Sequence, residues 1–98
     1  MELYVILRRG AWKSVTELKH AAARSTEVAN EEMATDVRWI RSYVLDEADG
    51  PVGTVCIYEA TSPEAIRKHA GLADIPVDEI IRVADTVVLR PDPVPVAA

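Results

Sequence analysis

Two kinds of hydrophobic spacing follow one another along the chain, and their order limits the fold more than any other feature of the sequence. Residues 2–7, 37–45, 54–60 and 80–89 have the period-two alternation or the Ile and Val content of strands. Residues 15–33 have the three-and-four spacing of an amphipathic helix. Residues 63–70 follow a capping serine and are predicted to form a second helix. The predicted order is strand, helix, strand, strand, helix, strand. This order is typical of a ferredoxin-like α+β fold, an antiparallel sheet with both helices on one face.

The starts of both helices are marked by capping residues. Ser14 and Glu17 are spaced as a capping box, and Ser62-Pro63-Glu64 supplies an N-cap, a proline at the first helical position and an acid in the first turn. We expect one ferredoxin-like domain over residues 1–90. Residues 91–98 are rich in proline and are predicted to form an extended C-terminal tail.

Composition narrows the classes of function. The net charge is −5, and no basic stripe of the kind that binds a phosphate backbone is present, so we expect no nucleic-acid partner. No apolar run approaches the roughly 20 residues of a membrane span, so we expect no membrane partner. Cys56 is the single cysteine, which excludes an internal disulfide framework and fits a reducing compartment. A cytoplasmic protein is the expectation.

The strand at residues 37–45 has two unlike faces. Strict alternation places Trp39, Arg41 and Tyr43 on one face and Ile40, Ser42 and Val44 on the other. If the helices cover Leu3, Val5, Leu7, Ile40 and Val44, the uncovered sheet face carries Glu2, Tyr4, Ile6, Arg8, Trp39, Arg41 and Tyr43. A face with this composition is costly to leave in water. We therefore predict a homodimer in which two sheets pack face to face as a dimeric α+β barrel.

The same residues are the candidate ligand-binding set. Arginine and aromatic side chains suit a small anionic or aromatic ligand, and they are also enriched at protein interfaces. The predicted lining comprises Tyr4, Arg8, Trp39, Arg41, Tyr43 and Tyr58. A ligand cavity and a pure dimer interface both remain open as interpretations.

His69 is the candidate metal ligand. It follows Ile66 by three positions, so it lies on the inward stripe of the second helix, near its carboxyl end, where the helix dipole favours the protonated form. A divalent ion would need further ligands, such as Glu59 or the acids of the Asp46–Asp49 turn. A structural histidine that caps helix carbonyls is the alternative. His20 points outward, and Cys56 is interpreted as an inert core or interface thiol.

Four segments resemble a known family. They are residues 37–44 (VRWIRSYV), 55–60 (VCIYEA), 62–70 (SPEAIRKHA) and 76–80 (PVDEI). Together they are similar to a family of small bacterial domains of unknown function that includes a nickel-binding protein of ferredoxin-like fold. The resemblance extends from Leu18 to Val88 and implies a dimeric ferredoxin-like domain and, for some members, nickel binding. It implies no particular reaction.

Three functions therefore remain open from the sequence. The first is a small binding protein, a homodimer that holds a divalent metal ion, with nickel favoured by the resemblance, or a small organic ligand. The second is a cofactor-independent monooxygenase or isomerase of the dimeric α+β barrel type, an analogy of fold alone. The third is a structural dimer without a ligand.

Overall fold

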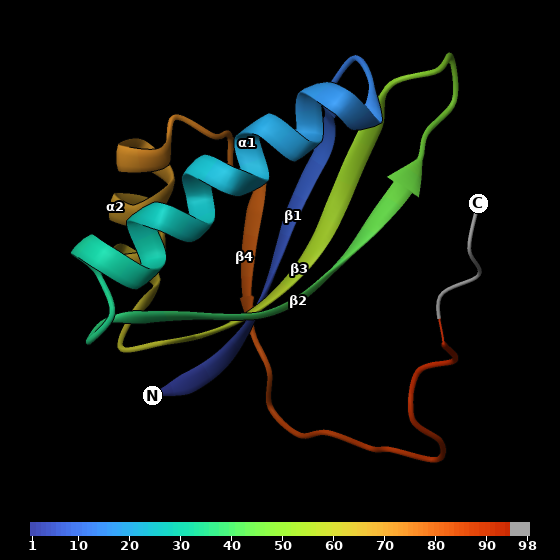
Figure 1. Ribbon diagram of the computed structural model, residues 1–98. Helices are drawn as coiled ribbons and strands as arrows, with labels where there is room; N and C mark the ends of the chain where they lie inside the picture. Colours follow the sequence, from blue (N-terminus) through green and yellow to red (C-terminus); the bar gives the residue numbers. More distant parts are fainter. Residues whose placement is uncertain (95–98) are drawn as a thin grey trace.

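Two helices lie against one face of a four-stranded antiparallel sheet in the computed structural model, which describes residues 1–94 (Figure 1). The elements are β1 (Glu2–Trp12), α1 (Val15–Glu27) with its π-helical continuation η1 (Val28–Glu32), β2 (Val37–Asp46), β3 (Val52–Ala60), α2 (Pro63–Ala73) and β4 (Glu79–Arg82). The strands lie side by side in the order β2, β3, β1, β4, which is the ferredoxin-like arrangement. The predicted α+β fold class and order of elements are confirmed.

Local sequence signals set the helix starts. The Ser14 hydroxyl accepts from the Glu17 amide at 3.2 Å, and the Ser62 hydroxyl accepts from the Ala65 amide at 3.1 Å. Each bond satisfies one of the free amides of a first helical turn. The second helix runs beyond the predicted end at Ala70 to Ala73, and it stops where Asp74 adopts a left-handed conformation with φ of 55°.

The helices cover the opposite face of β1 from the one predicted. Tyr4, Ile6 and Arg8 are all buried beneath the helices, whereas Leu3, Val5 and Leu7 are only partly buried. The prediction was wrong because both rows of this strand are largely apolar, so alternation alone does not distinguish the covered face from the open one. In the β1 row that was predicted to face away from the helices, Glu2 is the exposed residue, and its carboxylate pairs with Arg82 at 2.7 Å.

A β-bulge in β2 separates Trp39 from its predicted companions. Trp39 pairs with Tyr58 and Arg41 pairs with Ile57, so Ile40 is an extra residue between two successive partners on β3. An extra residue reverses the side on which all later side chains lie. Trp39 therefore lies on the helix-covered face with Tyr58, while Arg41 and Tyr43 lie on the open face. The prediction that these three share one face was wrong.

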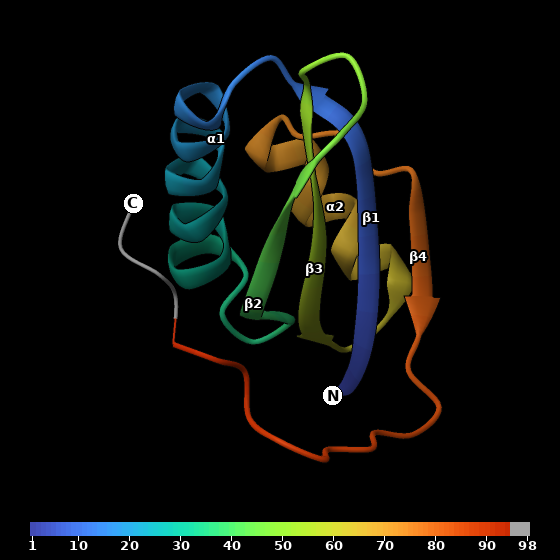
Figure 2. The same cartoon turned by 90° about the vertical axis from the view of Figure 1, so that its right-hand side faces the viewer.

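Neither helix covers the open face of the sheet (Figure 2). Its side chains are mainly aliphatic. Cross-strand pairing places the following side chains in neighbouring rows on this face: Leu3, Val5, Leu7, Arg41, Tyr43, Val55, Ile57 and Ile81. Most of the aliphatic members are partly exposed. Charged side chains also border this apolar surface, where Arg38 pairs with Glu59 at 3.6 Å.

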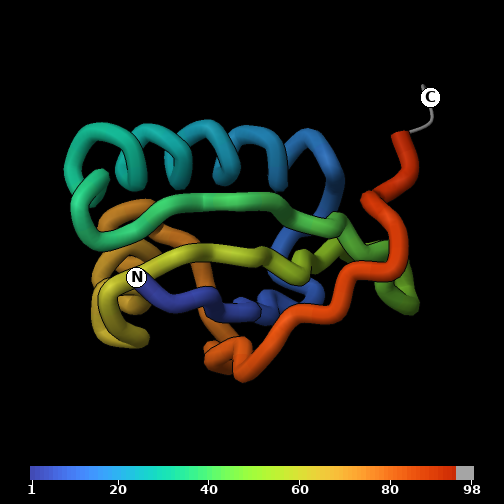
Figure 3. Tube along the Cα trace, turned by 90° about the horizontal axis from the view of Figure 1, so that it is seen from below, coloured from blue at the N-terminus to red at the C-terminus, as the bar shows by residue number. Residues whose placement is uncertain are grey.

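The last strand is shorter than predicted. It ends at Arg82, and residues 83–94 continue without regular structure from the β4 edge toward β2, on the side of the strands away from α1 (Figure 3). Asp92 there accepts from Arg41 Nη1 at 2.8 Å and from Tyr43 Oη at 2.6 Å. Of the predicted tail, residues 91–94 are exposed and residues 95–98 lie outside the described residues. Within residues 1–94, no helix has both the length and the apolar character needed to cross a bilayer.

Candidate functional site

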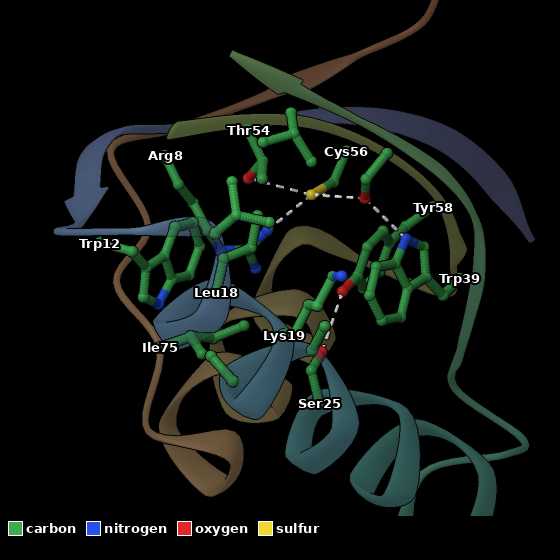
Figure 4. A pocket seen from close by; sticks show the side chains of 15 residues that line it. Arg8, Trp12, Leu18, Lys19, Ser25, Trp39, Thr54, Cys56, Tyr58 and Ile75 are labelled. Carbon is green, nitrogen blue, oxygen red and sulfur yellow. Dashed lines mark hydrogen bonds between the residues drawn. The ribbon is translucent and has the colours of Figure 1, made fainter. Parts of the chain in front are cut away.

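A cavity of about 170 Å³ lies between α1 and the helix-covered face of the sheet, and we call it the α1 cavity (Figure 4). Its lining is almost wholly apolar in surface and includes both tryptophans of the chain, Trp12 and Trp39. The space opens to solvent at the exposed residues Val15, Lys19 and Val44, and its apolar lining marks it as the candidate site.

Arg8 brings a buried positive charge to the α1 cavity. Its side chain extends from β1 and is 1% exposed. Nε donates to the Pro76 carbonyl at 2.7 Å, Nη1 donates to Cys56 Sγ at 3.2 Å, and the guanidinium lies 5.9 Å from the centre of the Tyr58 ring. Nη2 has no hydrogen-bond partner within residues 1–94. An arginine stays charged in proteins, so this buried cation is only partly satisfied by neutral groups.

A chain of hydrogen bonds runs along the sheet side of the cavity. Trp39 Nε1 donates to Ser42 Oγ at 2.8 Å, Ser42 Oγ donates to Cys56 Sγ at 2.9 Å, and the thiol lies 3.3 Å from Thr54 Oγ1 (Figure 4). Cross-strand register explains the contact, because Ser42 pairs directly with Cys56 across β2 and β3. These bonds fix the orientation of the Trp39 indole at the cavity wall.

Tyr58 and Ser25 line the cavity, and both contact His69, which is not part of the lining. Tyr58 Oη lies 3.3 Å from Ser25 Oγ, and burial raises the pKa of the Tyr58 hydroxyl. His69 is fully buried, and its Nε2–H donates to the Ser25 carbonyl at 3.0 Å. Burial also lowers the pKa of His69; the Ser25 carbonyl opposes this shift and the charge of Arg8 adds to it. The neutral imidazole is therefore favoured, contrary to the expectation that the helix dipole would favour protonation.

The structure divides the predicted ligand-binding residues between two sites. Arg8, Trp39 and Tyr58 line the α1 cavity. Arg41 and Tyr43 lie on the open face and contact Asp92. The last member, Tyr4, is buried in the main core cluster with Ile6 and Ile66.

The predicted metal residues are not brought together. His69 is buried in the helix layer, whereas Glu59 lies on the open face and faces Arg38. Within residues 1–94, no group of three or more His, Cys, Asp or Glu side chains is placed to hold an ion. In the β2–β3 turn, the Glu47 carboxylate is bound by the Arg9 side chain and the Gly10 amide instead. The described residues of a single copy therefore do not fit a nickel centre.

Several lining residues were not singled out by the sequence. Ser25, Thr54 and Trp12 reach the cavity from α1, β3 and β1, and Ser42 was assigned only to a strand face. A polar serine within the small-residue stripe of α1 is a weak signal that this position faces something other than a purely apolar core. No local feature of the sequence predicts the contact between Arg8 and Cys56, which lie 48 positions apart in the chain.

Comparison with known proteins adds a family and a fold. The family model described as nickel responsive protein SCO4226-like matches residues 4–83. The crystal structure of SCO4226 from Streptomyces coelicolor A3(2) is similar with a TM-score of 0.67 and 20% sequence identity, over 87% of this chain and 99% of that chain. No curated protein matches the chain significantly. At 20% identity, the structural likeness supports the fold alone.

Proposed function

Since the chain belongs to the family of nickel responsive proteins like SCO4226, we propose that it is a small binding protein that acts as a homodimer and holds a small ligand in the α1 cavity. The observation that carries this proposal is the cavity itself. Its surface is apolar, both tryptophans face it, and buried hydrogen-bonding groups stand along its wall. This combination of apolar surface with a few fixed polar groups is typical of small-molecule sites.

Fluorescence of the two tryptophans tests the ligand proposal. Because Trp12 and Trp39 both line the cavity, a compound that enters it changes their emission in a saturable way. A panel of charged and neutral compounds of about benzene size is titrated against wild-type protein and against Ala22→Leu, which fills the cavity from α1. Binding by wild type that is lost in the variant supports the proposal. No change with any compound, or equal binding by both proteins, contradicts it.

The open face supports the homodimer. Val5, Leu7, Val55 and Ile57 lie together there, partly exposed, and neither helix of the same copy covers them. Burial of apolar surface drives association, and a polar rim around an apolar centre is the usual anatomy of an interface. Beside this face, Val87, Val88 and Leu89 are 82%, 72% and 88% exposed, so they too are available to a second copy.

Sedimentation separates the dimer from the monomer. Ile57→Glu places a charge in the centre of the open face and is expected to produce monomers, because an unpaired charge in an apolar interface is strongly unfavourable. The matched control is Leu72→Glu on α2, at a leucine that is 48% exposed. This variant is expected to leave the dimer intact. Monomeric wild-type protein at working concentration would contradict the proposal.

Nickel is the second candidate ligand, because the family description names a response to nickel. Within residues 1–94 one copy gathers no ligand set, so nickel ions would be held by groups from more than one copy. His20 is the exposed imidazole on α1, and imidazole nitrogen is a preferred ligand of nickel. Calorimetric titration of tag-free protein tests the candidate: binding that is lost in His20→Ala and kept in His69→Gln supports a surface site. Absence of binding by the wild type removes nickel as a ligand.

A further inference from the structure

We infer that the α1 cavity takes a small organic anion, a monocarboxylate with an aromatic or branched aliphatic body, and that Arg8 holds its carboxylate. The inference rests on the proposed function, since it requires that the cavity take a ligand at all. It goes further by assigning the charge, size and chemical class of that ligand.

The first argument is the unbalanced charge of Arg8. The guanidinium is 1% exposed, its protein partners are a carbonyl oxygen and a thiol, and Nη2 has no partner within residues 1–94. A buried cation is ordinarily paired with an anion, because neutral acceptors do not replace its hydration fully. A carboxylate is the group that matches a guanidinium best, since two parallel N–H donors meet its two oxygens.

The second argument is the charge distribution around the cavity. The chain carries 16 acidic and 11 basic residues, yet the lining includes two cations, Arg8 and Lys19, and no Asp or Glu. Lys19 is exposed, as are Val15 and Val44, so these three residues mark the mouth of the cavity between α1 and the β2 edge. A cation at the mouth and another against the wall favour an anion over a neutral or positive molecule.

The third argument is size and surface. A dry protein cavity of roughly 150 Å³ is known to accept benzene. At about 170 Å³, the α1 cavity accepts one ring or branched chain with a carboxylate, and it is too small for a nucleotide or flavin, which need sites of several hundred Å³. Trp39 and Tyr58 stand at its wall as a stacked pair with ring centres 6.0 Å apart, an apolar surface suited to a flat body.

One internal group could balance Arg8 without a ligand. Cys56 Sγ lies 3.2 Å from Arg8 Nη1, and the Ser42 hydroxyl also donates to it. If this sulfur were a thiolate, the charge would already be paired within the chain. The ultraviolet absorbance of a thiolate at neutral pH, present in wild type and absent in Cys56→Ser, would therefore contradict the inference.

Matched pairs of ligands provide the main test. Benzoate, phenylacetate and 3-methylbutanoate are each compared with the corresponding amide, which keeps the size and removes the charge, by tryptophan fluorescence and by thermal shift of tag-free protein. We expect each carboxylate to bind roughly ten- to hundred-fold more tightly than its amide, the usual contribution of hydrogen bonds to a charged group. Equal affinity of acids and amides would overturn the inference while leaving the cavity proposal intact. No binding by either class would overturn both.

Variants of Arg8 assign the effect to one side chain. Arg8→Met removes the charge with an apolar chain of similar length and is expected to abolish the preference for acids over amides. Arg8→Lys keeps the charge and is expected to retain a weaker preference, so it serves if the methionine variant fails to fold. Arg67→Met, an exposed arginine on α2, is the control and is expected to bind as wild type does. An unchanged acid preference in folded Arg8→Met or in a charge-neutral Arg8→Gln would contradict the role of Arg8.

Discussion

Filling the α1 cavity is expected to stabilise the protein, and Ala22→Leu is the substitution that does so. Ala22 lies on α1 and lines the cavity. Leucine adds three carbon atoms, and each buried methylene contributes about 0.8 kcal/mol, so complete burial would contribute about 2.4 kcal/mol. Ordering the leucine side chain costs about 0.5–1 kcal/mol, and this position is only partly buried. The expected net increase in the free energy of unfolding is therefore about 1 kcal/mol, which corresponds to a rise in Tm of about 4–8 °C for a domain of 98 residues.

Chemical denaturation and calorimetry measure this difference directly. The matched control is Ala23→Leu, which makes the same change one position later, where the side chain is exposed. Its free energy of unfolding is expected to stay within about 0.5 kcal/mol of the wild type, as for most surface substitutions. If Ala22→Leu instead lowers stability by about 1 kcal/mol or more while the control is neutral, the space beneath α1 is already filled. The overpacking would then refute the cavity and the ligand proposal with it.

Three further predictions concern the groups around the cavity and the elements that position them. Because burial lowers the pKa of His69 from its ordinary 6.5, the folded state disfavours its protonation. The free energy of unfolding is expected to fall as the pH drops below about 6.5, by at most about 1.4 kcal/mol per pH unit, and to fall less steeply in His69→Gln; equal slopes in denaturation curves would contradict this. Gly53→Ala is expected to destabilise by 1–3 kcal/mol, typically about 2, because the added Cβ would overlap the Arg8 carbonyl oxygen, and unchanged urea unfolding would contradict that contact. Ser62→Ala removes the α2 cap and is expected to cost about 1 kcal/mol by the same measurement, whereas Ser62→Gly is expected to cost only a few tenths; equal losses would show that the cap is not responsible.

The limits of alternation are clearest in β1 and β2. Leu3, Val5 and Leu7 were expected to meet the helices because they form a regular apolar row, yet Tyr4 and Ile6 are the buried row. A strand with two apolar rows offers no local criterion for the covered face, since that choice depends on which row fits the helices. In β2, the bulge at Ile40 arises from pairing with β3, and pairing register is a property of two strands together.

The same reasoning explains how the candidate site was partly anticipated. Arg8, Trp39 and Tyr58 stood out by residue type, because arginine and aromatic side chains within strands indicate a site or an interface. Arg8 and Trp39 share a sheet face as predicted, but the bulge moves Arg41 and Tyr43 to the other face, and the helices of the same copy cover the face that was predicted to be open. His69 was correctly placed on the inward stripe of its helix, but its neutral state follows from complete burial.

The sequence by itself determined the order and type of the elements and where both helices begin, because caps, turns and periodicity act over a few neighbouring residues. Tertiary structure alone decided which sheet face the helices cover, how the cavity forms beneath α1, and that a buried guanidinium meets a thiol from the neighbouring strand. These features depend on contacts between residues far apart in the chain. Their energies come from burial and desolvation, which exist only once the layers have packed.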